Sequence, residues 1–351
     1  MDHDKKNNND DDDQTLKSTD TTTNTTPVAP RVFKPFSPCR SVDCYKKLYN
    51  VNEGAFGVVY CAQDKETNEI VALKKIKMEG EREGFPITSV REVKTMMELK
   101  HENIVSVKEI VLGKNINNIF MVMEFVEHDL KGLMEFVNKS FLQSVIKTLI
   151  HQLLSGVEYM HDNWVIHRDL KTSNLLYTNK GILKIADFGL AREFGSPIRP
   201  YSEGVVTLWY RAPELLLGST IYSTSIDIWS VGCIFAEIIS REVLLPGSSE
   251  IDQLDKIFKL FGTPNETVWP GFNKLPLVKH LNLIPQPFNN LKSKFPHITD
   301  NTFDLLSRLL AYDPEKRISA KDALNHPYFF ENPPPRDPLM MPTWPSSHKK
   351  T

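Results

Sequence analysis

The sequence is short of several features that would place it in other protein classes. Its few cysteines show neither the close paired spacing nor the neighbouring histidines of a zinc site, and they are Cys39, Cys44, Cys61 and Cys233. No uninterrupted apolar stretch is long enough to span a bilayer, and the first residues are acidic and polar, unlike a signal peptide. The formal net charge of −2 gives no reason to invoke nucleic acid or an anionic membrane. We therefore expect a soluble intracellular protein with reduced thiols, and neither nucleic acid nor membrane as a direct partner.

The chain does hold enough apolar sequence for one large folded unit. Of its 351 residues, 40% are hydrophobic and 25% are charged, so a sizeable core can be buried. The stretch up to about Pro30 differs, because it is rich in Asp, Asn and Thr and has almost nothing apolar to bury. We expect a disordered acidic tail over residues 1–44, a folded domain over residues 45–330 and a proline-rich tail over residues 331–351.

Two short motifs concentrate polar groups. The first, His167–Asn174, is His-Arg-Asp-Leu-Lys-Thr-Ser-Asn, and the second is Asp187–Gly189. Phosphoryl transfer from ATP needs such groups, because the acceptor hydroxyl must be positioned and the charge on the phosphoryl oxygens neutralised. An aspartate is ionised at neutral pH, so Asp169 is expected to orient the hydroxyl and accept its proton. Lys171 is expected to hold the γ-phosphate.

The spacing of the two motifs brings two oxygen ligands together. Residues 175–177 and 182–185 predict short strands, joined by a turn at residues 178–181 that ends in glycine. A hairpin folded there places Asn174 opposite Asp187, and their side-chain oxygens suit Mg²⁺. The alternative is an exposed charged loop followed by an unrelated hairpin, which requires both motifs to match a known pattern by accident.

In this order the motifs resemble those of the eukaryotic protein kinases. The resemblance implies an α+β, bilobal protein kinase fold with ATP and Mg²⁺ as cofactors. A small β-rich N-lobe with one main helix is expected over about residues 45–125, and a hinge over about residues 124–128. A larger, mostly helical C-lobe is expected over about residues 129–330.

Upstream, a lysine and a glutamate match the kinase pattern. Residues 71–74, Val-Ala-Leu-Lys, predict a strand whose Lys74 reaches the α and β phosphates in that family. Apolar residues then recur at helical spacing, at Val90, Val93 and Met97. The helix is expected to open near Ser89 and to present Glu92 to Lys74 as a catalytic ion pair. Ser89-x-x-Glu92 also fits a capping box, in which the glutamate merely satisfies a helix-start amide.

The phosphate loop departs from the kinase pattern. Residues 51–59, Val-Asn-Glu-Gly-Ala-Phe-Gly-Val-Val, keep the second and third glycines of the family at Gly54 and Gly57, with Asn52 at the first. Asparagine tolerates unusual backbone angles, so the turn is expected to survive. By itself the segment is indistinguishable from an ordinary hairpin, and its position before Lys74 makes it a nucleotide lid.

A hinge and two helices complete the pattern. Residues 119–123 predict a buried strand, and Glu124 and Val126 follow in the hinge whose backbone binds adenine in related kinases. The residues expected to bind the nucleotide are Val51, Asn52, Glu53, Gly54, Ala55, Phe56, Gly57, Val58, Val59, Ala72, Lys74, Glu124, Val126 and Leu176. An amphipathic helix is expected through Val145, Leu149, Leu153 and Val157. A nearly all-apolar helix follows around residues 226–231, where Asp227 either favours the helix dipole or, as in the family, holds the catalytic-loop backbone. We favour the second role.

Substrate preference is suggested by two segments. Lys171 in the catalytic loop is typical of serine/threonine kinases, and residues 205–214 resemble the cyclin-dependent group, with Val206 and Arg211 expected in its substrate pocket. That group accepts proline after the phosphorylated residue, because a pocket lacking an acceptor strands the amide hydrogen of any other residue. Mitogen-activated kinases share the preference, but their Thr-x-Tyr pair is absent from residues 200–203.

Residues 84–92 narrow the resemblance to the PITSLRE subgroup of cyclin-dependent kinases, with Val90 in place of leucine. The likeness covers the chain from about Pro38 to Pro345, and a related PISSLRE subgroup is the nearest rival. It implies an activating cyclin of the L type, protein substrates with Ser-Pro or Thr-Pro sites, and a nuclear role in transcription and pre-mRNA processing. The cytoplasm is left open as a second location.

The resemblance also implies control by phosphorylation of the activation loop. Ser202 is the expected site, and Arg91, Arg168 and Arg192 occupy the places of the three arginines that bind this phosphate in cyclin-dependent kinases. The alternative is that each arginine is separately solvated or paired with a carboxylate.

A catalytically weak pseudokinase that acts as a binding scaffold is the second class of function. Asn52 is its only support. Such scaffolds commonly lack the catalytic lysine or a metal ligand, whereas Lys74, Asp169, Asn174 and Asp187 are all present. The sequence therefore favours an active enzyme.

Overall fold

A computed structural model gives the architecture of the chain. It describes residues 39–54, 57–76, 87–114, 118–137, 139–195, 207–281 and 284–345, without the side chains of residues 52–54, 87 and 88. Cys39–Thr351 group into one unit by their contacts. Within the described ranges no helix combines the length and the apolar character that crossing a membrane requires. The four cysteines all lie in these ranges, and they are free thiols.

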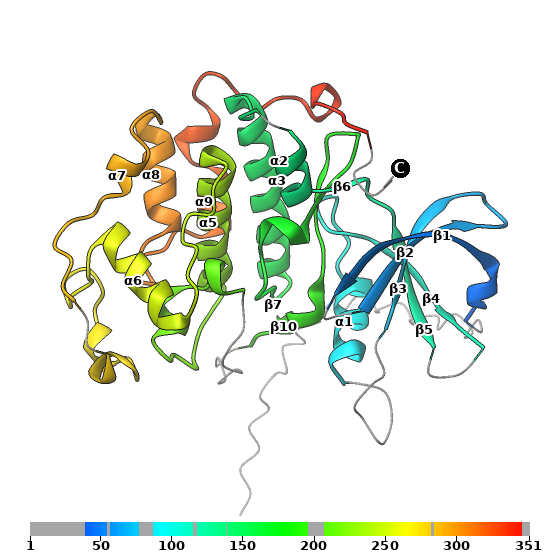
Figure 1. Ribbon diagram of the computed structural model, residues 1–351, viewed down its shortest axis with the longest axis horizontal. Helices are drawn as coiled ribbons and strands as arrows, with labels where there is room; N and C mark the ends of the chain where they lie inside the picture. Colours follow the sequence, from blue (N-terminus) through cyan, green and yellow to red (C-terminus); the bar gives the residue numbers. More distant parts are fainter. Residues whose placement is uncertain are drawn as a thin grey trace, which may run out of the picture. The chain divides into compact units, whose positions relative to one another are not determined.

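Five antiparallel strands of the described residues form one sheet in the order β1-β2-β3-β5-β4 (Figure 1). They are β1 (Tyr45–Gly54), β2 (Gly57–Asp64), β3 (Ile70–Lys75), β4 (Val107–Leu112) and β5 (Ile119–Glu124). Side chains alternate between the two faces of a strand. Val71 and Leu73 therefore enter a small core on one face, whereas Ala72 joins the main core on the other. The same alternation puts Lys74 on the face of Ala72.

Helix α1 (Ile87–Glu98) begins before the expected start. Ser89 therefore lies inside the helix rather than at its N-cap. The capping-box interpretation of Glu92 is wrong for this reason, since a capping box needs its serine at the helix boundary.

The apolar residues expected at helical spacing on α1 lie on different sides of the helix. Val90 and Met97 are 47% and 49% exposed, whereas Glu92 and Met96 are buried. Helix α1 packs against the 3₁₀ turn η3 (Phe188–Leu190) and β4, with Met96 in the main core and Val93 partly buried against it.

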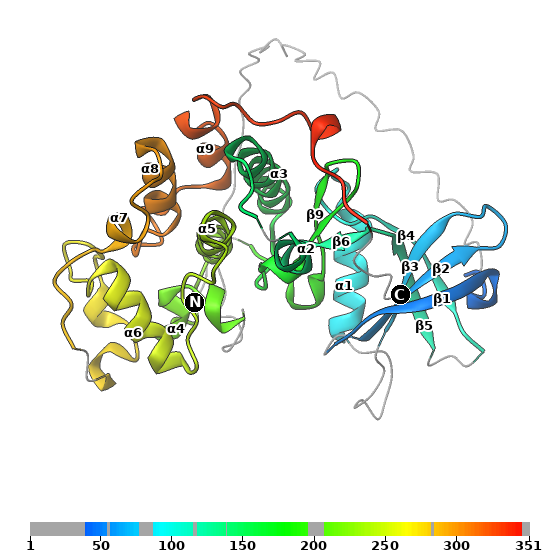
Figure 2. The same ribbon diagram turned by 45° about the horizontal axis from the view of Figure 1, so that its top comes forward.

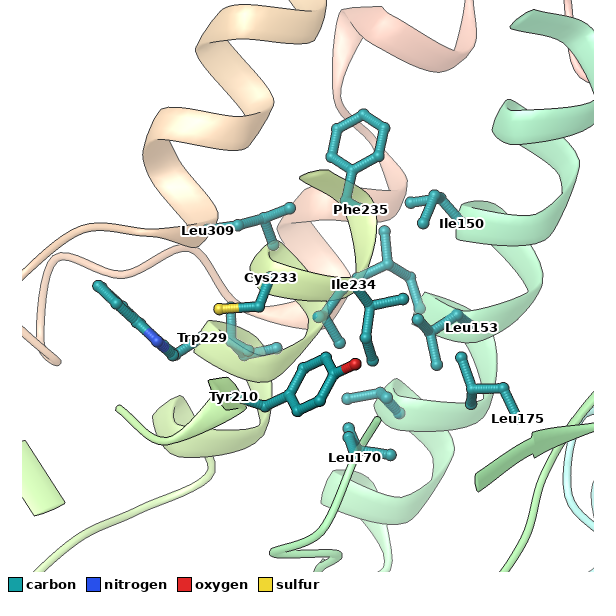
Figure 3. Packing of buried hydrophobic residues seen from close by; sticks show 14 of the residues in the cluster. Ile150, Leu153, Leu170, Leu175, Tyr210, Trp229, Cys233, Ile234, Phe235 and Leu309 are labelled. Atoms are coloured by element: carbon teal, nitrogen blue, oxygen red, sulfur yellow. The ribbon is translucent and has the colours of Figure 1, made fainter. Parts of the chain in front are cut away.

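The described helices of the C-lobe surround a core centred on α3 and α5. They are α2 (Leu130–Phe136), α3 (Gln143–Asp162), α4 (Pro213–Leu216), α5 (Ser225–Ser240), α6 (Glu250–Phe261), α7 (Leu291–Lys294), α8 (Asp300–Leu309) and α9 (Ala320–Leu324). The stripe expected on α3 is buried throughout, since Val145, Leu149, Leu153 and Val157 are all core residues. Figure 3 shows Ile150 and Leu153 of α3 on one side of Ile234 and Phe235 of α5, with Leu309 of α8 on the other. The expected α+β fold with a β-rich and a helical lobe is confirmed.

The described chain after β5 also contains short strands, which form two small sheets. They are β6 (His128–Asp129), β7 (Val165–Ile166), β8 (Leu175–Tyr177), β9 (Leu183–Ile185) and β10 (Arg192–Glu193). β8 and β9 form the expected hairpin, with Leu175 opposite Ile185. Its turn ends at Gly181 with a φ of 79°, where a Cβ atom would lie 2.0 Å from the carbonyl oxygen of Pro338. Glycine is required there both for the left-handed backbone and for the close approach.

The described structure begins ahead of the tail boundary expected at residue 44. A 3₁₀ turn spans Val42–Cys44, and the guanidinium of Arg40 lies 3.1 Å from Asp64 and 3.0 Å from Glu109. The backbone amide of Leu112 also donates to the Arg40 carbonyl at 3.0 Å. Residues 39–44 therefore belong to the folded part, because strands distant in sequence supply their contacts.

The proline-rich segment after residue 331 packs on the C-lobe as far as Pro345. Figure 2 shows this segment, in red, running past α3 towards β6. The Tyr177 hydroxyl donates to the carbonyl of Pro342 at 2.7 Å, and the Trp344 ring lies 5.5 Å from the Tyr177 ring and 6.3 Å from the Phe141 ring, centroid to centroid. Met341 is buried beside them. These contacts make the described part of the segment a piece of the domain surface.

Candidate active site

Lys74 lies near the end of β3, where its neighbours across the sheet are Val59 and Met121. Its Nζ is 2.6 Å from Glu92 Oε1 and 3.0 Å from Asp187 Oδ1. Burial by itself lowers the pKa of Lys74, but the charges of Glu92 and Asp187 outweigh it and hold this pKa above its ordinary value. The expected ion pair with Glu92 is therefore formed, and a charged ammonium joins β3, α1 and the segment after β9.

The Asp169 carboxylate is held from two sides. Oδ2 accepts hydrogen bonds from Lys171 Nζ at 2.7 Å and Asn174 Nδ2 at 3.1 Å. Oδ1 accepts from the backbone amide of Thr207 at 3.1 Å and from its hydroxyl at 2.8 Å. Lys171 Nζ also donates to the Thr207 hydroxyl at 3.0 Å. These bonds fix the direction of a carboxylate that can still accept a proton.

The backbone ahead of Asp169 is anchored by α5. Asp227 accepts hydrogen bonds from the backbone amides of His167 and Arg168, both at 2.9 Å, and its Oδ2 lies 3.0 Å from His161 Nε2. Burial by itself raises the pKa of Asp227, but the hydrogen bond and charge of His161, with further contacts, lower it overall. Arg168 has a φ of 67°, a left-handed backbone that costs on the order of 1–3 kcal/mol for such a residue. The favoured role of Asp227, holding the catalytic-loop backbone, is what the structure shows.

Asn174 and Asp187 border the same cavity and fit a magnesium ion. Asn174 Nδ2 donates to the Asp169 carbonyl at 2.8 Å, and among the described residues no group donates to Asn174 Oδ1. Mg²⁺ usually takes one or two protein oxygens and completes its shell with phosphate and water. No three His, Cys, Asp or Glu side chains of the described ranges gather into a full metal cage. The pair is thus suited to a metal that arrives with a nucleotide and neutralises phosphate charge.

A cavity of about 380 Å³ lies beside these groups. The expected nucleotide-binding residues that line it are Val51, Gly57, Val59, Ala72, Lys74, Glu124, Val126 and Leu176, and Glu92 is also in its wall. Val58 does not line it, because Gly57 and Val59 face it and side chains alternate along β2. Ala55 and Phe56 lie outside the described residues, and Asn52, Glu53 and Gly54 are described in backbone alone.

Gly57 is the loop position with a visible reason for glycine. Its φ is 131°, and a Cβ atom there would lie 2.4 Å from the carbonyl oxygen of Lys75. Any side chain would therefore displace β3 next to Lys74. The glycine expected from the phosphate-loop pattern is therefore required by the backbone conformation and by the close approach of β3, in the wall of the cavity.

Three arginines expected to bind a phosphate lie near one another. Burial lowers the pKa of Arg192, and the positive charges of Arg168 and Arg91 lower it further. Arg168 also donates to the Leu190 carbonyl and to the Tyr222 hydroxyl, each at 2.8 Å. The cluster repels itself, so an anion bound there would relieve the repulsion. Ser202, the expected phosphorylation site, lies outside the described residues.

Arg211, expected in the substrate pocket, follows the 3₁₀ turn η4 (Leu208–Tyr210) and forms an ion pair with Glu250 at the start of α6. The Trp209 indole donates to the Gly247 carbonyl at 2.9 Å. Both contacts attach this segment to the region around the start of α6. Val206, the other expected pocket residue, lies outside the described residues.

Thr207 is the functional residue that the sequence patterns missed. It donates two hydrogen bonds to Asp169 from 38 positions along the chain, and no local motif joins the two. The cavity wall likewise includes residues that were not singled out from the sequence as binding residues, namely Met96, Val105, Met123, Phe125, Asp129, Ser173 and Ala186.

Comparisons with known proteins agree with this geometry. A protein kinase domain model matches residues 45–329. The chain is 79% identical over 317 residues to cyclin-dependent kinase 11 of Dictyostelium discoideum, across 90% of this chain and 88% of that protein. It is 55% identical to cyclin-dependent kinase 11B of Mus musculus and 57% identical to cyclin-dependent kinase G-1 of Oryza sativa subsp. indica. Those alignments cover 92% and 89% of this chain but only 41% and 46% of the two longer proteins.

Proposed function

The chain belongs to the protein kinase family, and within it to the PITSLRE-type cyclin-dependent serine/threonine kinases, and from this premise we propose that it phosphorylates Ser-Pro and Thr-Pro sites of nuclear proteins. ATP and Mg²⁺ are the cofactors that such an activity requires. An L-type cyclin is the proposed activator, and transcription or pre-mRNA processing the proposed process. The cytoplasm is a second proposed location.

The orientation of Asp169 is the observation that carries the proposal. Lys171 and Thr207 each hold one of its carboxylate oxygens, so the carboxylate is preorganised before a substrate binds. On the cavity side, Lys74 and Asp187 form an ion pair with 3.0 Å between Nζ and Oδ1. In this proposal Asp169 is the base, and Lys74, in the wall of the cavity, is the cation that binds phosphate.

The proposed transfer is a single displacement. The acceptor oxygen forms a bond to the γ-phosphorus while the bond to the β,γ-bridging oxygen breaks, and ADP leaves with that electron pair. Asp169 takes the hydroxyl proton late in the step, and Lys171 binds the γ-phosphoryl oxygens. Lys74 holds the α and β phosphates. Asn174 and Asp187 would supply the oxygens that hold Mg²⁺, and the ion would offset the charge on the phosphates.

The preference for proline rests on the substrate side of the site. Proline has no amide hydrogen, so a pocket without an acceptor at that position penalises every other residue. The attachment of Arg211 to Glu250 of α6 supports a rigid wall next to this pocket. We propose that this wall receives the residue after the acceptor serine or threonine.

Dependence on a cyclin is supported by the outer face of α1. Val90 and Met97 leave apolar surface on a helix whose Glu92 must stay against Lys74. A partner that binds this arrangement better than others shifts the equilibrium towards it. The isolated chain is proposed to be nearly inactive, and a monomer as fast as the complex would contradict this.

Phosphorylation of Ser202 is proposed as the second activating event. Arg91, Arg168 and Arg192 form the positive cluster that supports it, because their mutual repulsion is relieved by a phosphate. Ser202→Ala in the cyclin complex should lower activity, and mass spectrometry of the active enzyme should find phosphate on Ser202. Fully active material with an unmodified Ser202 contradicts the proposal.

The test of the function is a transfer assay with radiolabelled ATP on the chain co-expressed with an L-type cyclin. We expect Mg²⁺-dependent labelling of a Ser-Pro peptide, little labelling of the matched Ser-Ala peptide, and none after chelation. Asp169→Asn should abolish transfer. Asp255→Asn, which alters an exposed ion pair with Lys259 on α6, is the matched control and should not. Cyclin binding without any transfer by the wild type would instead identify a scaffold.

A further inference from the structure

A buried polar cluster lies directly behind the catalytic loop, and no step of the proposed transfer uses it. It consists of Thr172, Tyr210 and Glu237, which are 1%, 4% and 5% exposed. Thr172 begins the turn that ends at Asn174, Tyr210 ends η4, and Glu237 lies near the end of α5. Figure 3 labels Tyr210 with its hydroxyl directed away from Trp229.

The hydrogen bonds of the cluster meet at one carboxyl group. The Thr172 hydroxyl donates to Glu237 Oε1 at 3.1 Å, and the Tyr210 hydroxyl donates to Glu237 Oε2 at 2.6 Å. The oxygens of the two hydroxyls are 3.2 Å apart. Each oxygen of Glu237 therefore receives a donor from a different segment of the chain, the catalytic loop on one side and the segment ahead of α4 on the other.

Both segments carry groups that hold Asp169. Thr172 stands next to Lys171 and two positions before Asn174, both of which donate to Asp169 Oδ2. Tyr210 donates its backbone amide to the Thr207 carbonyl at 2.9 Å, and Thr207 binds Asp169 Oδ1. A shift of either segment would change one side of the Asp169 carboxylate. The cluster thus joins the two halves of this support to the same residue of α5.

Stability alone does not explain the cluster. Burial raises the pKa of Glu237 above its ordinary value, so keeping a carboxyl group there costs free energy. Even a buried ion pair can often be replaced by well-packed apolar residues of similar volume without loss of stability. Most of the buried side chains of α5 are apolar, including Ile234 and Phe235. The Glu237 carboxyl group adds directional contacts, because its hydrogen bonds fix the positions of Thr172 and Tyr210 more narrowly than apolar contacts would.

We propose that Thr172 is a positioning residue of this kinase, whose hydroxyl, through Glu237 and Tyr210, sets the catalytic loop in register with the segment that bears Thr207 and Arg211. The proposal rests on the proposed kinase activity for its effect on rate. Its effect on structure can be measured without turnover. Thr172 is buried and is not among the residues that line the cavity, so it acts through its neighbours.

The first test compares variants of buried threonines in the cyclin complex. Thr172→Val should lower kcat about 10-fold to 100-fold and raise the KM for the peptide, with the KM for ATP unchanged. Thr172→Ser keeps the hydroxyl and should retain most of the rate. Thr148→Val is the matched control, since Thr148 is also buried and its hydroxyl donates to the Ser144 and Arg336 carbonyls, away from the site. The control should lose a similar amount of thermal stability, and its kcat should stay within about 2-fold of the wild type because, among the described residues, the Thr148 hydroxyl makes no hydrogen bond to the segments that hold Asp169.

The second test is hydrogen exchange of the same proteins without ATP. Thr172→Val should speed exchange in residues 168–174 and also in residues 207–211, although the substitution lies in only one of these segments. Tyr210→Phe should do the same from the other side, and the double variant should be non-additive because both hydroxyls act on Glu237. Faster exchange confined to the substituted segment overturns the proposal, as does an unchanged kcat in Thr172→Val. An inactive wild type with the coupled exchange pattern would reject the kinase function alone and keep the coupling.

Discussion

Helices α1 and α5 each contribute a carboxylate to the active site, yet they are held in opposite ways. Every residue of α5 from Ser225 to Ile238 is buried, and Asp227 binds the catalytic-loop backbone from inside that core. Helix α1 buries Glu92 and Met96 but leaves Val90 and Met97 about half exposed. The carboxylate of α5 is therefore fixed by packing, whereas that of α1 depends on the ion pair with Lys74 and on whatever covers its outer face.

This difference indicates that α5 is held in one position, whereas α1 can move. A helix with a complete core cannot move without exposing apolar surface, which costs roughly 25 cal/mol per Å². A helix with one buried ion pair and an apolar outer face can be displaced or held by a partner at much smaller cost. Regulation is thus expected to act on α1, and α5 is expected to serve as the fixed reference for the catalytic loop.

The largest effect is expected at the ion pair between α1 and β3. Lys74→Met should reduce phosphotransfer more than about 10³-fold, because the charge at the phosphates is lost. Circular dichroism should show the fold retained, since α5 and its core are untouched. Lys108→Met is the control, as it removes an exposed lysine that pairs with Glu69 at 2.7 Å on the same lobe. Normal transfer by Lys74→Met at saturating cyclin would refute the assignment of the site.

The two helices should respond very differently to loss of an apolar side chain. Phe235→Ala on α5 should lower the free energy of unfolding by about 3–5 kcal/mol, because a cavity opens in a closed core. Val90→Ala on α1 should change it by less than about 0.5 kcal/mol, since the side chain is half exposed. Urea unfolding of the isolated chain measures both. Equal losses of the free energy of unfolding would show that α1 is packed as firmly as α5 and would contradict the difference between the two helices.

The Asp227 anchor predicts a specific dependence on pH. Its pKa is lower in the folded chain than the ordinary aspartate value, so its contribution to stability is present above about pH 4 and is lost as the pH falls through the lowered pKa. Asp227→Asn should lower the free energy of unfolding by about 1–3 kcal/mol at neutral pH, because a neutral amide oxygen accepts these buried hydrogen bonds more weakly than a carboxylate does. The difference in the free energy of unfolding between the wild type and Asp227→Asn should become smaller below about pH 4. A gap that stays constant in acid would show that the charge of Asp227 is not what stabilises the loop.

The smallest loss of stability is expected at the C-terminal segment, which packs on the surface of the C-lobe rather than in its core. Trp344→Ala should lower the free energy of unfolding by about 1–2 kcal/mol, less than a fully buried aromatic, because the ring is only half buried against Tyr177 and Phe141. Leu339→Ala, at an 88% exposed position of the same segment, should have no measurable effect. If the two variants behave alike, the segment contributes nothing to the stability of the domain.

The sequence was most informative where a pattern is local. The hairpin between Asn174 and Asp187 follows from strand residues and a glycine turn, and the structure forms it with Leu175 opposite Ile185. The buried face of α3 likewise follows from helical spacing. On α1 helical spacing predicted the helix, and only the structure shows that Val90 and Met97 face outward while Met96 packs in the core.

The sequence alone determined the order of the motifs that contain Lys74, Asp169 and Asp187, and with them the protein kinase family. The tertiary structure decided that Thr207 supports Asp169, that Glu92 pairs with Lys74 rather than capping its helix, and that Trp344 packs on the C-lobe. The physical reason is distance along the chain. Spacing within a strand, turn or helix is set by the backbone, whereas a contact between residues far apart in sequence depends on how all the elements pack together, and no short stretch of sequence contains that information.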